Sequence, residues 1–174
     1  MLRESLREAE RRGDAVARSR SLTYLMVAGR KRGDVDAVRK AIAPVIERAR
    51  EASLPEYEAM ALANRAWVAW RTGEGQKAAT DALAALEMWE ALPIGYFFDW
   101  MALWPLLALA LAAQRIEQAV EYARRMLPPS QQLLQEPVRS TVDNAVDAWD
   151  VGRPAETEDL LRRAVRAAGD LGYL

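Results

Sequence analysis

Apolar positions recur along the chain three or four residues apart, the spacing of one face of a helix, and almost never alternate with polar positions as in a β-strand. Alanine, leucine, arginine and glutamate dominate the sequence, and these residues favour helices. Residues 100–113 are apolar throughout, but this stretch is shorter than the roughly 20 residues that span a bilayer. The pattern therefore predicts an all-α fold with one helix buried at the centre of its core.

Two kinds of break separate the predicted helices. The first kind is a short polar turn, and its four centres are Gly33, Gly73, Gln114 and Gly152. The second kind contains proline and lies at 53–55, 92–95 and 127–130. A glycine in the left-handed conformation ends a helix, and a proline ends one helix or opens the next. The polar turns are 40, 41 and 38 residues apart, and a period near 40 indicates a stack of helical repeats.

The breaks divide the chain, which we treat as one domain over 1–174, into a lone helix at about 2–12 and four antiparallel helix pairs forming an α-solenoid. The expected pairs lie at about 15–52, 55–92, 96–127 and 137–170. Pro44 and Pro105 fall inside predicted helices, where each is expected to bend or split the helix. Because a repeat cannot bury its apolar face alone, the lone helix indicates that the chain begins inside a longer array.

The unit 60–93 resembles a tetratricopeptide repeat. It has an aromatic residue before the turn (Trp70), the turn pair Gly73 and Glu74, small alanines on the second helix, and a closing proline. The chain departs from that family in its period, which is nearer 40 than the usual 34, and in Gln114, which stands where a glycine is expected. The resemblance implies a superhelix in which the first helix of each pair lines the concave surface.

The segments WVAWRTGEG, WPLLALALA and the final GYL are similar to the C-terminal arrays of large bacterial regulators. In those proteins an ATPase core of the signal-transduction type is joined to an adenylate cyclase or to a LuxR-type DNA-binding domain. The resemblance implies that this chain is the regulatory or sensor region of a larger bacterial signalling or transcription-regulating protein. The first residues, MLRESLREAERRGD, contain no apolar run of the signal-peptide type, so we expect a cytoplasmic location.

The sequence contains no cysteine and no histidine, which excludes disulfides, thiolate nucleophiles, histidine bases and the usual zinc ligands. No grouping of serine, lysine or paired carboxylates forms a catalytic site, so we expect no enzyme activity, no cofactor and no metal. Asp143, Asp147 and Asp150 share one helical face and could hold a hard cation, but a solvated acidic edge is the favoured interpretation.

Two glycine-containing motifs have structural interpretations. Arg-Gly-Asp occurs at 12–14 and 32–34, where arginine suits a helix end, glycine the left-handed cap and aspartate the next helix start. The stretch 73–77 resembles a phosphate-binding loop only loosely, since it lacks the preceding strand and the full spacing from glycine to lysine. We therefore expect all three to be turns.

Charge is distributed unevenly although the net charge is only −1. Residues 1–50 carry 13 basic and 7 acidic side chains, whereas residues 51–150 carry 7 basic and 14 acidic ones. The basic first part could contact nucleic acid, but its arginines alternate with glutamates at the spacing of ion pairs on a solvated helix face. Nucleic-acid binding is therefore a minor alternative.

A candidate binding surface follows from the distance of each residue to its turn. Its predicted members on the concave face are Met60, Asn64, Trp67, Arg71, Met101 and Trp104. Trp67 and Trp104 would form an apolar floor with polar groups beside it, suited to a peptide segment or protein domain, including one of the same polypeptide. The alternatives are a small-molecule effector in the same groove, or tryptophans that belong to the core. A homodimer is also expected to be possible, and no membrane contact is expected.

Overall fold

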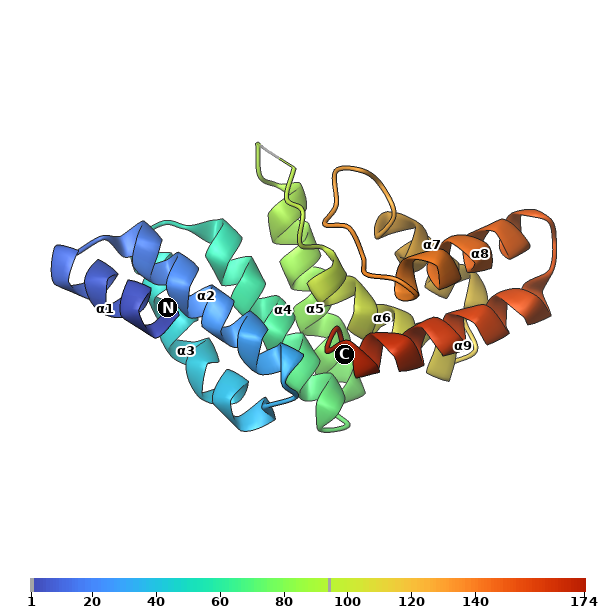
Figure 1. Cartoon of the computed structure of the whole chain (residues 1–174), viewed down its shortest axis with the longest axis horizontal. Coiled ribbons are helices and arrows are strands. Elements are labelled where there is room, and N and C mark those ends of the chain that lie inside the picture. The colour runs from blue at the N-terminus through green and yellow to red at the C-terminus, as the bar shows by residue number, and fades with distance from the viewer. Residues whose placement is uncertain (1, 94) are drawn as a thin grey trace.

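The computed structural model describes residues 2–93 and 95–174 and contains helices without strands in this part of the chain (Figure 1). The all-α prediction is confirmed. The helices are α1 (Leu2–Arg12), α2 (Ala15–Lys31), α3 (Val35–Glu51), α4 (Pro55–Arg71), α5 (Gly75–Glu90), α6 (Trp100–Ala112), α7 (Ile116–Arg125), α8 (Val138–Asp150) and α9 (Pro154–Asp170).

The short polar turns have the backbone geometry expected of helix ends. Gly33 adopts a φ of 68°, and Gln114 takes the same left-handed region at 57° despite its side chain. Asp14 and Asp34 follow the glycines of the two Arg-Gly-Asp motifs, and their carboxylates accept hydrogen bonds from backbone N–H groups of α2 and α3. Both motifs therefore serve as helix-to-helix turns.

Pro44 and Pro105 lie inside α3 and α6, and neither splits its helix. One helix start was predicted wrongly. The helix expected from residue 96 begins instead at Trp100. Before it, the carbonyl of Tyr96 accepts a hydrogen bond from the side chain of Gln131. The carbonyl of Phe97 accepts a hydrogen bond from the backbone N–H of Gln132. These long-range bonds hold 96–97 in a non-helical conformation.

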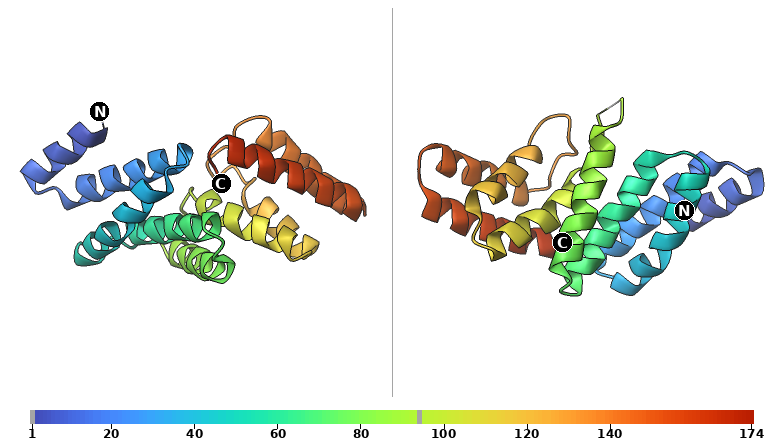
Figure 2. Two further views of the ribbon diagram at one scale, coloured as in Figure 1. Left: turned by 90° about the horizontal axis from the view of Figure 1, so that it is seen from below. Right: turned by 180° about the vertical axis from the view of Figure 1, so that it is seen from behind.

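Neighbouring helices pack against each other along the chain, and α4 also meets α2 and α6, whereas α6 and α8 make no contact in the described residues. The row of helices curves (Figure 2, left), and α9 runs back from the far end toward the middle of the molecule. Its carboxyl end lies close to the end of α2, and α9 also packs on α6. This return brings residues 171–174 next to the end of α2, near the centre of the row.

The core is centred on α4 and α6. Every residue of α6 from Trp100 to Leu107 is buried, as expected for its apolar run, and α5 meets α4 through the fully buried Ala78, Ala82 and Ala85. Small side chains at these positions allow close approach of the two helices. In the described residues no helix is both long and apolar enough to cross a membrane.

Candidate functional site

Four of the six predicted surface residues lie on α4 and two on α6, and these two helices pack against each other. Five of them are buried, with Trp67 and Trp104 at 0% exposure, and only Arg71 is exposed at the edge. The face is covered by the chain itself. Residues 171–174, which we call the tail segment, lie against Trp104, while the guanidinium groups of Arg30 and Arg71 lie over the ring of Trp67.

Arg30 at the end of α2 holds the tail segment in place. Its side chain is fully buried, and Nε and Nη2 donate to the carbonyl oxygen of Tyr173 at 3.1 and 2.6 Å. Nη1 donates to the carbonyl oxygen of Met101 at 2.9 Å. Burial lowers the pKa of Arg30 to about 9. Carbonyl oxygens and the faces of Trp67 and Trp100 therefore take the place of a carboxylate beside this cation.

The free carbonyl of Met101 has a local cause. In a helix this oxygen accepts the N–H of the residue four positions later, which here is Pro105 and has no N–H. A buried carbonyl without a donor is destabilising, and Arg30 supplies the missing donor from another helix. Pro105 in α6 and Arg30 in α2 are thus linked through the Met101 carbonyl, although they lie in different helices.

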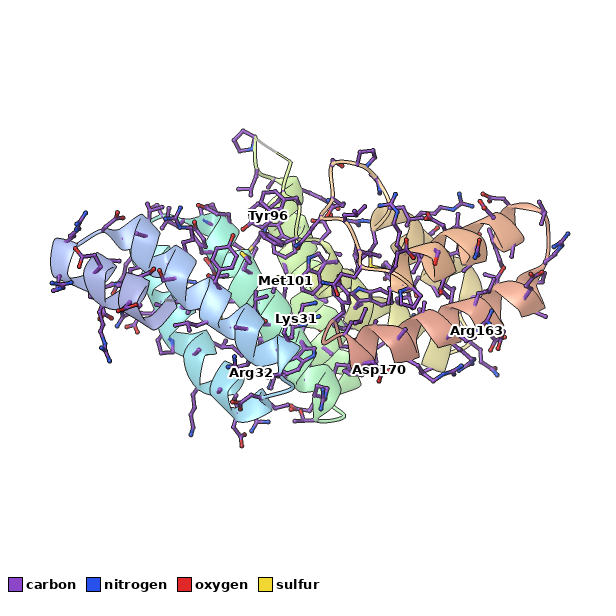
Figure 3. All side chains as sticks on the ribbon, viewed as in Figure 1. Lys31, Arg32, Tyr96, Met101, Arg163 and Asp170 are labelled. Carbon is purple, nitrogen blue, oxygen red and sulfur yellow. The ribbon has the colours of Figure 1, made fainter. Side chains whose placement is uncertain are left out.

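Tyr173 fills an aromatic site between α2 and α6. Its ring stands edge-on to Trp100, with 5.0 Å between ring centroids, and lies 6.2 Å from Trp104. Lys31 Nζ lies 3.6 Å from the Tyr173 ring centroid and donates to the carbonyl of Leu171 at 3.1 Å. Burial, followed by the charge of the neighbouring arginine, lowers the pKa of Lys31. Figure 3 shows Lys31 and Met101 beside this central region.

Gly172 allows the tail segment to approach α2 closely. Its φ is 69°, and a Cβ added there would lie 2.6 Å from the Cα and 2.7 Å from the carbonyl oxygen of Lys31. Backbone atoms cannot move aside as a flexible side chain can, so a larger residue would push the segment away. The tail segment is therefore held by three kinds of contact: the close approach at Gly172, the aromatic packing of Tyr173, and hydrogen bonds to the Tyr173 carbonyl.

Sequence reasoning missed Arg30, Gly172 and Tyr173. One signal was available for the arginine. It stands three residues before its turn, and the equivalent positions in the other units are Trp70, Leu111 and Trp149. A charged residue at a position that is otherwise apolar marks a break in the repeat pattern. Nothing periodic marks the glycine and the tyrosine, because their role depends on the return of α9 across the molecule.

Several cavities lie away from the tail segment. One of about 730 Å³ opens between α3 and α5, which make no contact with each other in the described structure. Its floor is apolar (Ile46, Val68), and on one rim Arg65 donates two hydrogen bonds to Asp81 at 2.8 and 2.7 Å. A smaller cavity, about 260 Å³, lies between α2, the start of α4 and residues 96–98, and Met60 of the predicted surface is one of its walls.

Several buried polar atoms on this face have no hydrogen-bond partner. They are Thr23 Oγ1, Asn64 Oδ1, Trp67 Nε1 and Trp104 Nε1. The Asn64 side chain is oriented by its other atom, Nδ2, which donates to the carbonyl of Met60 at 2.8 Å. Such atoms are uncommon in folded proteins and mark places where a bound group could supply a partner.

The acidic residues of α8 and the glycine-containing stretch 73–77 form ion pairs and a turn. Asp143 lies 3.7 Å from Arg139, Asp150 pairs with Arg124, and the part of the chain that the structure describes contains no grouping of three metal-binding side chains. Residues 73–77 form a turn in which the Glu74 carboxylate accepts hydrogen bonds from Thr72 and Lys77, and these bonds lower its pKa. No phosphate-binding loop is formed there.

The expected ion pairs of the basic first part are also present. Arg11 and Arg12 both pair with Glu8 within α1, the arrangement typical of a solvated helix face. Trp70 and Trp149, each three residues before a turn, are half-buried and pack against the core. Comparison of the chain with protein-family models, with curated proteins and with solved structures finds no match.

Proposed function

We propose that the chain is a non-catalytic binding module whose first-helix face accepts an extended peptide segment. The helix pairs would stack as an α-solenoid of the tetratricopeptide type, with α2, α4 and α6 on the concave side and α9, instead of α8, packed on α6. The packing of α2 on α4 and of α4 on α6 supports this arrangement. In such a stack the inner face is continuous and can hold a peptide along its length.

The seating of the tail segment carries the proposal. The residues that cap the end of α9 already lie on the predicted face, with the Tyr173 carbonyl bound by Arg30 and the tyrosine ring between Trp100 and Lys31. Hydrogen bonds to a backbone carbonyl hold any peptide, whereas an aromatic site selects one side chain. The face thus has both elements of peptide recognition. A partner segment with a small residue before an aromatic one would compete with the tail.

A binding experiment tests this proposal in the full-length chain. Tyr173→Ala removes the ring that fills the site but leaves the rest of the tail. This variant should bind a fluorescently labelled GDLGYL peptide, the sequence of residues 169–174, in an anisotropy titration. The unaltered chain should bind it at least about tenfold more weakly, because its own tyrosine is held at high effective concentration.

The matched control is the peptide GDLGAL, which lacks the ring and should not bind the Tyr173→Ala variant. Circular dichroism would first establish that the variant is folded. If the folded variant binds neither peptide, or binds both equally, the face is not a peptide site.

We further propose that the module belongs to a larger bacterial regulator and that its partner segment lies in the same polypeptide or in another protein. A homodimer stays a prediction, and light scattering at several concentrations would test it.

A small-molecule sensor is the second candidate function, and the cavity of about 260 Å³ beside Met60 favours it. The tail segment contacts the other end of the same face. One module could therefore hold a peptide at one end and a small ligand at the other.

A further inference from the structure

The smaller cavity is built from three segments that are distant in sequence. Its walls come from α2, from the first turns of α4 and from the non-helical residues before α6. Its lining includes Arg20, Thr23, Tyr24, Glu56, Tyr57 and Tyr96. At about 260 Å³ the cavity lies below the range of about 300–1,000 Å³ that is typical of sites for drug-sized ligands. Its size fits a molecule with a single aromatic ring system.

Aromatic rings form most of the wall and are held in place by one another. Tyr96 stacks on Trp89 with 5.2 Å between centroids, and its hydroxyl donates to Met60 Sδ at 2.8 Å. Tyr24 and Phe97 are 41% and 48% exposed, which is unusual for large rings at one opening. The cavity therefore offers fixed ring faces inside and uncovered rings at its mouth. Figure 3 shows Tyr96 near Met101, on the same side of the molecule as Lys31.

One hydroxyl in the cavity wall has no partner. The Thr23 side chain is only 1% exposed, and its Oγ1 forms no hydrogen bond. A buried hydroxyl without a partner destabilises a fold, so a ligand that accepts or donates a hydrogen bond there would be favoured. Burial raises the pKa of Tyr57, so its hydroxyl remains a neutral donor at physiological pH. The hydroxyls of Thr23 and Tyr57 would recognise polar atoms of a ligand.

Two opposite charges complete the site. Arg20 on α2 and Glu56 on α4 both line the cavity, and neither forms an ion pair with any side chain that the structure describes. A purely cationic ligand would be opposed by the guanidinium, and a purely anionic one by the carboxylate. A ligand that carries one charge of each sign satisfies both groups.

We propose that this cavity binds the zwitterion of an aromatic amino acid. Its carboxylate would pair with Arg20, its ammonium with Glu56, and its ring would lie against Tyr57 and Tyr96. Ring stacking and two charge-assisted contacts are each weak at a partly exposed site, but together they select this class of molecule. The inference goes beyond peptide binding, because the cavity is separate from the tail segment and would remain if no peptide bound there.

Calorimetric titration of the full-length chain tests the proposal. L-phenylalanine, L-tyrosine and L-tryptophan should bind with one site per chain. L-leucine keeps both charges but lacks the ring, and N-acetyl-L-phenylalaninamide keeps the ring but lacks both charges. Each of these should bind at least about tenfold more weakly, a factor that corresponds to one lost contact of about 1.4 kcal/mol. Choline, a cation without a carboxylate, should not compete.

Substitutions that replace each charged side chain with a neutral one test whether binding occurs in this cavity. Arg20→Gln and Glu56→Gln should each weaken aromatic amino acid binding at least about tenfold. Because neither residue forms an ion pair, both variants should keep the melting temperature of the unaltered chain. The matched controls are Arg115→Gln and Glu121→Gln, exposed positions at the other side of the molecule, and they should leave binding unchanged.

Three results would overturn the proposal. One is the absence of binding by any aromatic amino acid to the unaltered chain. Another is binding that survives both cavity substitutions. The third is equal binding of the uncharged amide or of choline, which would mean that the ring or the cation alone is recognised. None of these results depends on whether the GDLGYL peptide binds, so the two functions are tested separately.

Discussion

The partnership of Arg30 with Pro105 makes a quantitative prediction. Arg30→Met keeps much of the side-chain volume but removes the donors to the carbonyls of Met101 and Tyr173. Each buried carbonyl left without a donor costs about 1–3 kcal/mol, so the two together cost about 2–6 kcal/mol. The loss is reduced by the removal of a buried cation, whose desolvation is seen in its lowered pKa. The single substitution therefore measures a difference between these effects.

A double-mutant cycle isolates the contact between the two residues. In a Pro105→Ala background, residue 105 regains an N–H that can bond the Met101 carbonyl within α6. Arg30→Met should then leave one carbonyl unsatisfied instead of two, and its destabilisation should fall by about 1–3 kcal/mol. The desolvation of the cation is common to both backgrounds and cancels. Urea denaturation followed by circular dichroism measures each free energy of unfolding.

Pro44 provides the matched control for this cycle. It lies inside α3, and the carbonyl that it leaves free belongs to the exposed Lys40, which water can reach. Pro44→Ala and Arg30→Met should therefore be additive within about 0.5 kcal/mol. If the Pro105 pair is equally additive, the arginine does not replace the missing helical hydrogen bond, and the explanation for its burial fails.

Three further predictions concern the tail segment, the tyrosines and one ion pair. Gly172→Ala should destabilise the chain by about 1–3 kcal/mol in urea denaturation. Gly169→Ala places its Cβ in open space beside α9 and should stabilise the chain by about 0.5–1 kcal/mol. Equal effects of the two substitutions would contradict the close approach of Gly172 to α2. Burial raises the pKa of Tyr96, so its contribution to stability is complete below the unfolded value of 10.0 and is lost as pH rises above it. The lowered pKa of Arg30 acts in the opposite direction, because it makes the fold more stable as pH rises above about 9. The loss is therefore measured as the difference in unfolding free energy between the unaltered chain and Tyr96→Phe from about pH 8 to pH 11, and this difference should shrink as pH rises. Arg65→Ala should cost about 2–3 kcal/mol because it leaves the buried Asp81 carboxylate unpaired, and a change below 0.5 kcal/mol, the usual limit for a surface position, would argue against that pair.

The candidate site was only partly accessible to sequence reasoning. Counting from the turns assigned Trp67 and Trp104 to one face, because helical periodicity fixes the direction of each side chain relative to its own turn. The covering of that face by Tyr173 could not be read in this way. It requires α9 to cross back toward α2, and that path depends on the packing of whole helices.

The cavity shows the same division between local and distant signals. Thr23 and Met60 occupy the positions in α2 and α4 that the turn spacing assigns to one face. The third wall comes from Tyr96 and its neighbours, where a helix was expected. Their backbone is held open by hydrogen bonds from residues 131 and 132, and no pattern within 95–98 signals a partner so far along the chain.

The sequence by itself determined the helices and most of their ends. These features depend on interactions over a few residues, such as the left-handed glycine at 33, the capping aspartate at 34 and the apolar spacing between turns. Tertiary structure alone decided which side chain satisfies the Met101 carbonyl and which segment covers the tryptophans. A charge can be buried only where donors and acceptors from distant parts of the chain converge, and local sequence carries no record of that convergence.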